Sequence, residues 1–231
     1  MSEAERPGSD EPYWTERPRS RSAPTERRFL YRGELLSFAV DAGVFSSHGI
    51  DPGTALLIEN LVLAPTDRVL DLGCGWGAVG VAAAKACPRG QVILTDVNRR
   101  AVRLARQNLA RNRVANAEVR VGPFFEPVAG ERFDVIVTNP PYRIGRERIL
   151  RLLEEAPAHL APGGRLLLVG KGSEGIRFYQ AWLREHWSGP VEVLGRGSGY
   201  RVLEAGARSE PPAARAALPG RRRSSSGGRS A

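Results

Sequence analysis

The sequence contains little cysteine or lysine and has no long apolar run. Its 231 residues include two cysteines, Cys74 and Cys87, which form neither a metal-binding spacing nor a disulfide framework. No metal site is therefore expected. No apolar run approaches the ~20 residues of a membrane-spanning helix, and the polar N-terminus lacks a signal-peptide core. These absences predict a cytoplasmic protein with no membrane partner.

The positive charge is almost all arginine. Lys85 and Lys171 are the only lysines among 34 Lys and Arg residues, and the formal net charge is +9. Such a balance is typical of proteins that bind a polyanion, and nucleic acid is the obvious candidate. An arginine-biased coding sequence with a basic tail would give the same totals, so charge alone leaves both interpretations open.

Two terminal stretches have the composition of disordered chain. Residues 1–28 are rich in Pro, Ser, Glu and Arg, and their six acidic and six basic side chains cancel. Residues 206–231 carry six arginines against Glu210, which makes this stretch basic. Neither stretch has enough aliphatic side chains to bury, so both are predicted to be disordered tails around one domain over residues 29–205.

Strand-like apolar runs alternate with helix-like segments between these tails. Strands are expected over 68–71, 91–96, 118–121, 133–138 and 165–169, with helices over 78–86, 98–111, 144–160 and 174–186. The domain ends in a predicted hairpin of residues 191–194 and 200–204. This alternation predicts an α/β fold with a doubly wound, Rossmann-like sheet of seven strands, mostly parallel, with an antiparallel strand at the C-terminal hairpin.

The segment ahead of the first of these strands is less regular. Residues 29–40 fit either a strand pair or a helix. Asp51-Pro52-Gly53-Thr54 is typical of a helix start, because proline is tolerated in the first turn, and a helix over 55–63 is expected. Phe45 could lie over a ligand site or belong to the core.

A glycine-rich loop follows the first strand of the alternation. Asp71-Leu72-Gly73-Cys74-Gly75-Trp76-Gly77-Ala78 contains the pattern G-x-G-x-x-A, and Asp96 follows about twenty residues later. This pattern is typical of an adenosine cofactor, with nicotinamide dinucleotides among the candidates. The carboxylate of Asp71 would repel a pyrophosphate and attract a cationic amine, which argues against the dinucleotide.

The second motif is Asn139-Pro140-Pro141-Tyr142, directly after the apolar run 133–138. Prolines cannot donate to a sheet ladder, so the strand ends here and leaves Asn139 at its carboxyl end. Ligands of open α/β sheets bind at these ends. The motif offers an amide oxygen, backbone carbonyls and an aromatic ring, although a purely structural turn would also use two prolines.

Together, the loop, Asp96 and Asn139-Pro140-Pro141-Tyr142 resemble a class I S-adenosylmethionine-dependent methyltransferase that methylates amino groups. Two further stretches, Gly43-Val44-Phe45-Ser46 and Asp51-x-Gly53-Thr54, resemble the methyltransferase small-domain family. Its best-known members are ribosomal RNA guanine-N2 methyltransferases, which carry an additional N-terminal domain. The resemblance covers roughly residues 29–205 and implies S-adenosylmethionine as the cofactor.

The resemblance also implies a role for each motif residue. Asn139, Pro140 and Tyr142 are the expected catalytic group, since the amide oxygen and the Pro140 carbonyl would accept the hydrogens of a planar amine. Phe45, Tyr142 and Arg143 are expected to contact the substrate. The cofactor is expected to be held by Asp71, Gly73, Cys74, Gly75, Gly77, Asp96, Val97, Phe124 and Asn139.

The acceptor stays open at this point. Guanine N2 of ribosomal RNA, bound alone or in a ribosomal subunit by a monomeric enzyme, is the favoured hypothesis. The same Asn-Pro-Pro-Tyr motif also serves adenine-N6 and protein-glutamine methylation, and an RNA-binding scaffold without activity is a further alternative. The arginines that begin at Arg143 would line an RNA path or form an exposed helix face.

Overall fold

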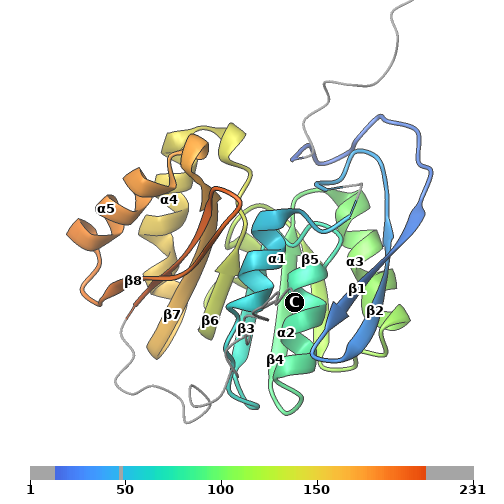
Figure 1. Ribbon diagram of the computed structural model, residues 1–231, viewed down its shortest axis with the longest axis horizontal. Helices are drawn as coiled ribbons and strands as arrows, with labels where there is room; N and C mark the ends of the chain where they lie inside the picture. Colours follow the sequence, from blue (N-terminus) through green and yellow to red (C-terminus); the bar gives the residue numbers. More distant parts are fainter. Residues whose placement is uncertain (1–13, 47–48, 207–231) are drawn as a thin grey trace, which may run out of the picture.

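The computed structural model describes residues 14–46 and 49–206, which are built around one seven-stranded sheet (Figure 1). Its strand order is β5-β4-β3-β6-β7-β9-β8. Strands β3 to β7 pair in parallel, whereas β9 pairs antiparallel with both β7 and β8, so the predicted fold class is confirmed. The strands are β3 (Arg68–Leu72), β4 (Gln91–Asp96), β5 (Ala117–Val121), β6 (Phe133–Thr138), β7 (Leu160–Lys171), β8 (Val191–Gly197) and β9 (Tyr200–Ala205).

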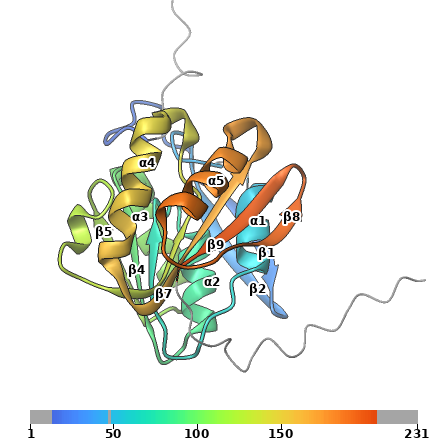
Figure 2. The same ribbon diagram turned by 90° about the vertical axis from the view of Figure 1, so that its left-hand side faces the viewer.

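Helices cover both faces of the sheet (Figure 2). On one face lie α1 (Pro52–Glu59), α2 (Ala78–Ala86) and α3 (Arg99–Arg111); on the other lie α4 (Arg146–Glu155) and α5 (Ile176–His186). Alternate side chains of each strand point to opposite faces of the sheet and so belong to two hydrophobic cores. Val69 packs with the first helix group, and Leu70 and Leu72 pack with the second. No helix in the described ranges is both long and apolar enough to cross a membrane.

A two-stranded sheet packs against α3 at the edge of the molecule. It consists of β1 (Thr25–Tyr31) and β2 (Glu34–Val40), so residues 29–40 belong to a strand pair. Asn108 on α3 accepts a hydrogen bond from the Ala39 N–H (2.7 Å) and donates to the Ala39 carbonyl (2.9 Å). Asn112, one turn later, makes the same two bonds with Ser37 (2.9 and 2.8 Å). Two asparagine side chains thus satisfy the free edge of β2 as a neighbouring strand would.

The prediction that residues 1–28 form a disordered tail is wrong for residues 14–28. Strand β1 begins at Thr25, and the preceding segment is held by polar contacts with the domain. Arg100 donates to the Ser20 carbonyl (2.7 Å), Ser22 donates to Asp41 (2.6 Å), and Glu16 lies 2.8 Å from the Arg99 guanidinium. Composition detects missing apolar burial, but it cannot detect polar partners that lie far away in the sequence. Residues 1–13 and 207–231 lie outside the described residues.

The expected helix over 144–160 is shorter and differently bounded. It is replaced by a 3-10 turn (η2, Tyr142–Ile144), α4, and a second 3-10 turn (η3, Ala156–His159). Leu160 already belongs to β7 and pairs with Phe133. The prediction failed because apolar spacing continues across Pro157, whose missing N–H ends the α-helical pattern. Two short 3-10 turns complete the fold, η1 (Glu126–Val128) and η4 (Gly172–Glu174).

Candidate active site

A cavity lies at the carboxyl ends of the central strands. The chain continues from β3 to β4 and β5 on one side and to β6 on the other, so the strand order reverses between β3 and β6. Ligands of doubly wound sheets bind at such a reversal. The residues that line the cavity are Trp14, Val44, Phe45, Leu72, Gly73, Gly75, Thr95, Asp96, Val97, Ala101, Gly122, Pro123, Phe124, Thr138, Asn139, Pro140, Pro141, Ile144, Arg148 and Leu152.

The glycine loop presents bare backbone to this cavity. Gly73 and Gly75 have left-handed φ angles of +74° and +55°, and a Cβ added to either would meet no atom within 4 Å. The Gly73 N–H is anchored to the Thr95 carbonyl at 2.9 Å. Glycine is required here because of both the backbone conformation and the open space that a ligand can enter.

Gly77 lies at a close contact between two helices. It caps the N-terminus of α2 with φ +89°, and an added Cβ would lie 3.2 Å from the Cβ of Ala105 on α3. Gly77 does not line the cavity, so its glycine allows close packing of α2 against α3. The predicted contact between Gly77 and the cofactor stays a prediction.

Asp96 ends β4 and faces the cavity. Its Oδ2 accepts from the Gly75 N–H and its Oδ1 from the Asn98 N–H, both at 2.8 Å. Burial raises the pKa of Asp96 to about 6, although these backbone bonds partly oppose the shift. A carboxylate offers about four lone pairs, so both oxygens can still accept from the two hydroxyls of a ribose. Asp96 therefore fits an adenosine cofactor.

The raised pKa of Asp96 makes cofactor binding pH-dependent. Because the ribose hydroxyls would donate to the ionised carboxylate, binding favours the deprotonated form of Asp96. Below a pH of about 6, Asp96 is largely protonated and must lose this proton when the cofactor binds. We expect S-adenosylmethionine to bind about tenfold more weakly at pH 5 than at pH 7.5, as measured by titration calorimetry. The Asp96→Asn variant should bind weakly and show a flat profile over this range. An equally steep profile in that variant would assign the dependence to another group.

Asp71 and Cys74 are buried and are not among the residues that line the cavity. Asp71 is 2% exposed; burial raises its pKa to about 7, the backbone N–H of Gly80 opposes this, and the Asp96 charge adds to it. Burial likewise raises the pKa of Cys74 well above its ordinary value, so it remains a thiol. The contacts expected between the cofactor and these two residues stay predictions.

Thr54 orients the amide of Asn139. The Asn139 Nδ2 donates to the Thr54 hydroxyl at 3.0 Å, which leaves Oδ1 as the free acceptor of this amide. Thr54 is held in the first turn of α1, where the side chain of Asp51 accepts from its N–H (3.1 Å) and from that of Gly53 (2.9 Å). Thr54 was not among the predicted site residues, although the motif Asp51-x-Gly53-Thr54 contained the signal.

Loss of the Thr54 hydroxyl should therefore lower turnover. Thr54→Val keeps the side-chain shape but removes the acceptor for Asn139 Nδ2, so the amide loses its fixed orientation. A hydrogen bond of this kind contributes about 1 kcal/mol, and we expect kcat to fall roughly fivefold with an unchanged Kd for S-adenosylmethionine. Thr54→Ser keeps the hydroxyl and should retain most activity. Equal kcat values for the two variants would contradict this role.

Tyr142 and Arg143 lie in the chain between two residues of the cavity lining, Pro141 and Ile144. The Tyr142 hydroxyl donates to the Val169 carbonyl at 2.9 Å, and its ring packs beside Tyr179 with 5.6 Å between centroids. Burial raises its pKa well above the ordinary value. Tyr142 thus ties the acceptor loop to β7 and is not among the residues that line the cavity, and its stacking on the substrate stays a prediction. Arg143 is exposed in η2 and also lies off the cavity wall, whereas Arg148 lines it.

Other expected residues do come together. Phe45, Val97, Phe124 and Pro140 all line the cavity with the groups described above. Sequence reasoning missed Trp14, because it lies in a stretch whose composition resembles disordered chain. Phe124 has a left-handed φ of +44°, a strained conformation for an aromatic residue, and it follows β5 directly.

Comparisons with known proteins agree with this architecture. The chain resembles a 16S rRNA N2 methyltransferase (RsmC) of T. thermophilus, solved in complex with AdoMet and guanosine, with a TM-score of 0.71, 29% identity and coverage of 83% of this chain and 52% of that chain. The class of fold is therefore that of S-adenosylmethionine-dependent methyltransferases. The family model described as "Methyltransferase small domain" matches residues 35–204, and the chain belongs to this family. A nicotinamide-dependent oxidoreductase is excluded, because S-adenosylmethionine is the cofactor of this family.

Curated relatives extend the same family. YbxB of Bacillus subtilis, described as uncharacterized, is 30% identical over 197 residues, which are 84% of this chain and 98% of that protein. The ribosomal RNA small subunit methyltransferase C of Haemophilus influenzae is 34% identical over 164 residues, which are 69% of this chain and 48% of that protein. The chain thus spans nearly all of the first relative and about half the length of the second.

Proposed function

We propose that this protein transfers a methyl group from S-adenosylmethionine to N2 of guanine in ribosomal RNA. The free Oδ1 of Asn139, fixed by the bond from Nδ2 to Thr54, is the observation that carries the proposal. It lies at the end of β6, in the same cavity as Asp96 and the glycine loop. The part of the cavity that suits the cofactor is therefore adjacent to the part that suits an amine.

The proposed chemistry uses acceptors and requires no strong base. When bound, S-adenosylmethionine supplies a methyl group on a positively charged sulfur. Asn139 Oδ1 and the Pro140 carbonyl accept the two hydrogens of the exocyclic amine, which turns its lone pair out of conjugation with the ring. Both acceptors interact more strongly as positive charge develops on nitrogen, so they stabilise the transition state more than the ground state.

The remaining lining residues fit the adenosine and the flat acceptor. Val97 and Phe124 follow β4 and β5 beside Asp96, which suits an adenine ring held by packing. Phe45 and Pro141 supply apolar contacts on the Asn139 side. A base in duplex RNA has to leave its stack to enter such a cavity, whereas a base in a loop is already accessible.

Support for the RNA acceptor comes from the relatives. The T. thermophilus enzyme is named for 16S rRNA and N2, and the H. influenzae relative for small-subunit ribosomal RNA. We extend this acceptor to the present chain, with naked RNA or a ribosomal subunit as the form recognised. A monomeric, cytoplasmic enzyme is part of the same proposal, since one domain contains both halves of the site.

Nucleoside mass spectrometry of ribosomal RNA from a deletion strain tests this proposal. Loss of one N2-methylguanosine, restored by the wild-type gene and not by an Asn139→Ala gene, is the expected result. Unchanged N2-methylguanosine with a lost N6-methyladenosine, or with a lost glutamine methyl in a release factor, would replace the acceptor while keeping the enzyme class. No change in any methylated amine would leave the scaffold hypothesis as the better account.

A further inference from the structure

Three arginines converge on one exposed face beside the acceptor loop. Arg196 on β8 and Arg201 on β9 are register partners, so their side chains project from the same side of the hairpin. Arg177 lies in the first turn of α5, which packs over β8 and β9. We call the set Arg177, Arg196 and Arg201 the arginine face.

The arginine face lacks acidic partners. None of its three side chains forms an ion pair within residues 14–46 and 49–206. The side chain of Arg201 donates instead to the neutral Gln180 Oε1 at 3.3 Å. Partial desolvation and the neighbouring charges of Arg177 and Arg196 lower the pKa of Arg201, which shows that the three cations repel one another.

Like charges directly opposite each other destabilise a strand pair. Other arginines of the described chain have acidic partners: the half-buried Arg68 and Arg120 both pair with Glu131, and the buried Arg165 pairs with Glu204. The unpaired set on β8, β9 and α5 therefore suits an external anion with several charges. Guanidinium groups fit phosphate oxygens in particular, because their planar N–H groups match phosphate geometry.

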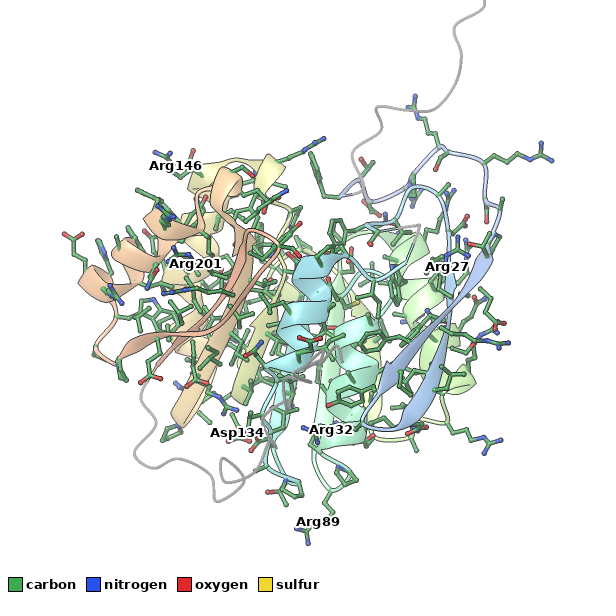
Figure 3. The ribbon with its side chains drawn as sticks, in the orientation of Figure 1. Arg27, Arg32, Arg89, Asp134, Arg146 and Arg201 are labelled. Atoms are coloured by element: carbon green, nitrogen blue, oxygen red, sulfur yellow. The ribbon has the colours of Figure 1, made fainter. Side chains whose placement is uncertain are left out.

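The position of the arginine face connects it to the catalytic loop. Arg201 is the register partner of Gly170 on β7, and a Cβ added to Gly170 would lie 2.3 Å from the Tyr142 hydroxyl. Tyr142 therefore lies over the strand position next to Arg201, and Asn139 is three residues earlier in the chain. In Figure 3, Arg146 and Arg201 both lie on the left side of the molecule, Arg146 near the top and Arg201 at mid-height, whereas Arg32 and Arg89 lie lower.

We propose that the arginine face binds the sugar-phosphate backbone of the RNA whose base enters the cavity. This inference rests on the proposed RNA acceptor. Phosphate contacts position a nucleic acid without reading its sequence, so the arginine face sets the path of the strand and Asn139 selects the amine. Lys171, at the end of β7 with its Nζ 5.7 Å from the centre of the Tyr200 ring, continues the positive surface toward α1.

Two double variants that remove the same number of positive charges separate this role from a general effect of net charge on RNA binding. The first is Arg177→Gln/Arg196→Gln, and the matched control is Arg32→Gln/Arg89→Gln; all four side chains are exposed. Binding is measured by fluorescence anisotropy with a labelled single-stranded RNA over a range of salt concentrations. Methyl transfer to ribosomal RNA from the deletion strain is measured in parallel, and so are the Tm and the Kd for S-adenosylmethionine.

We expect the first variant to bind RNA about tenfold more weakly at low salt, and the slope of log K against log salt to fall by about 2. The control should keep the wild-type slope, and both variants should keep the wild-type Tm and cofactor affinity. Equal loss in the two variants, or no loss in the first, would overturn the assignment. Absence of methyl transfer to RNA by the wild-type protein would instead refute the proposed function, so the two failures are distinguishable.

Discussion

Asn139→Ala should lower kcat by a factor of about 10²–10³ while leaving the Kd for S-adenosylmethionine within about twofold of the wild-type value. Removal of one transition-state acceptor in a preorganised site typically has an effect of this size. The cofactor should still bind, because Asp96 ends β4, the glycine loop follows β3, and no hydrogen bond among the described residues joins either to the Asn139 side chain. Single-turnover methyl transfer and calorimetric titration measure the two quantities separately.

Comparison with Thr54 sharpens the Asn139 experiment. If Asn139 acts through an Oδ1 that Thr54 orients, the double variant Asn139→Ala/Thr54→Val should be no slower than Asn139→Ala alone, because the orienting bond has nothing left to orient. Additive losses would assign Thr54 an independent role. Full activity of Asn139→Ala would remove the basis for the proposed chemistry.

Arg165→Ala should destabilise the fold more than any surface substitution. The Arg165 side chain is 2% exposed, with Nε 3.0 Å from Glu204 Oε2 on β9, and its Nη2 donates to the Val62 carbonyl. Its removal takes the Arg165 cation away from Glu204 and opens a cavity between β7 and the segment before β3. Breaking such a pair costs roughly 3–5 kcal/mol of the free energy of unfolding. Denaturant titration followed by circular dichroism measures this loss.

The control for Arg165 removes both charges. Arg165→Met/Glu204→Gln keeps much of the side-chain volume and leaves no unpaired ion, so it should recover more than half of the lost stability. If the single and double variants are equally unstable, the loss comes from packing and not from the broken ion pair. If the free energy of unfolding of Arg165→Ala lies within about 1 kcal/mol of the wild-type value, the ion pair does not stabilise the fold as expected.

The main sheet could be predicted from the sequence because its strands are short apolar runs ended by glycine or proline. Strand β6 was predicted with both of its ends, since its last residue, Thr138, precedes Asn139 and two prolines. Its position in the centre of the sheet, beside β3, is what makes the motif a cavity wall. The notable failure at the sheet, the start of β7 at Leu160, came from apolar spacing that fits a helix and a buried strand equally well.

The site was less predictable wherever a side chain depends on distant partners. The sequence predicts a function for Asn139 and Asp96 because each lies at the carboxyl end of a strand. It does not show that the Thr54 hydroxyl fixes the Asn139 amide. Tyr142 is a different case. An aromatic residue next to Asn139 is also well placed to fasten the loop, and the Tyr142 hydroxyl bonds to the Val169 carbonyl on β7, far away in the sequence. Trp14 reaches the cavity from a stretch with almost no apolar composition.

The two asparagines that hold β2 to α3 have a consequence for hydrogen exchange. The amides of Ser37 and Ala39 bond to side chains of Asn112 and Asn108, so their protection reports whether α3 is docked on β2. Asn108 also donates to the Trp76 carbonyl at 2.8 Å, inside the glycine loop. A ligand that steadies this loop should therefore slow exchange at Ala39, an amide in a different sheet, and β2 becomes a remote sensor of cofactor binding.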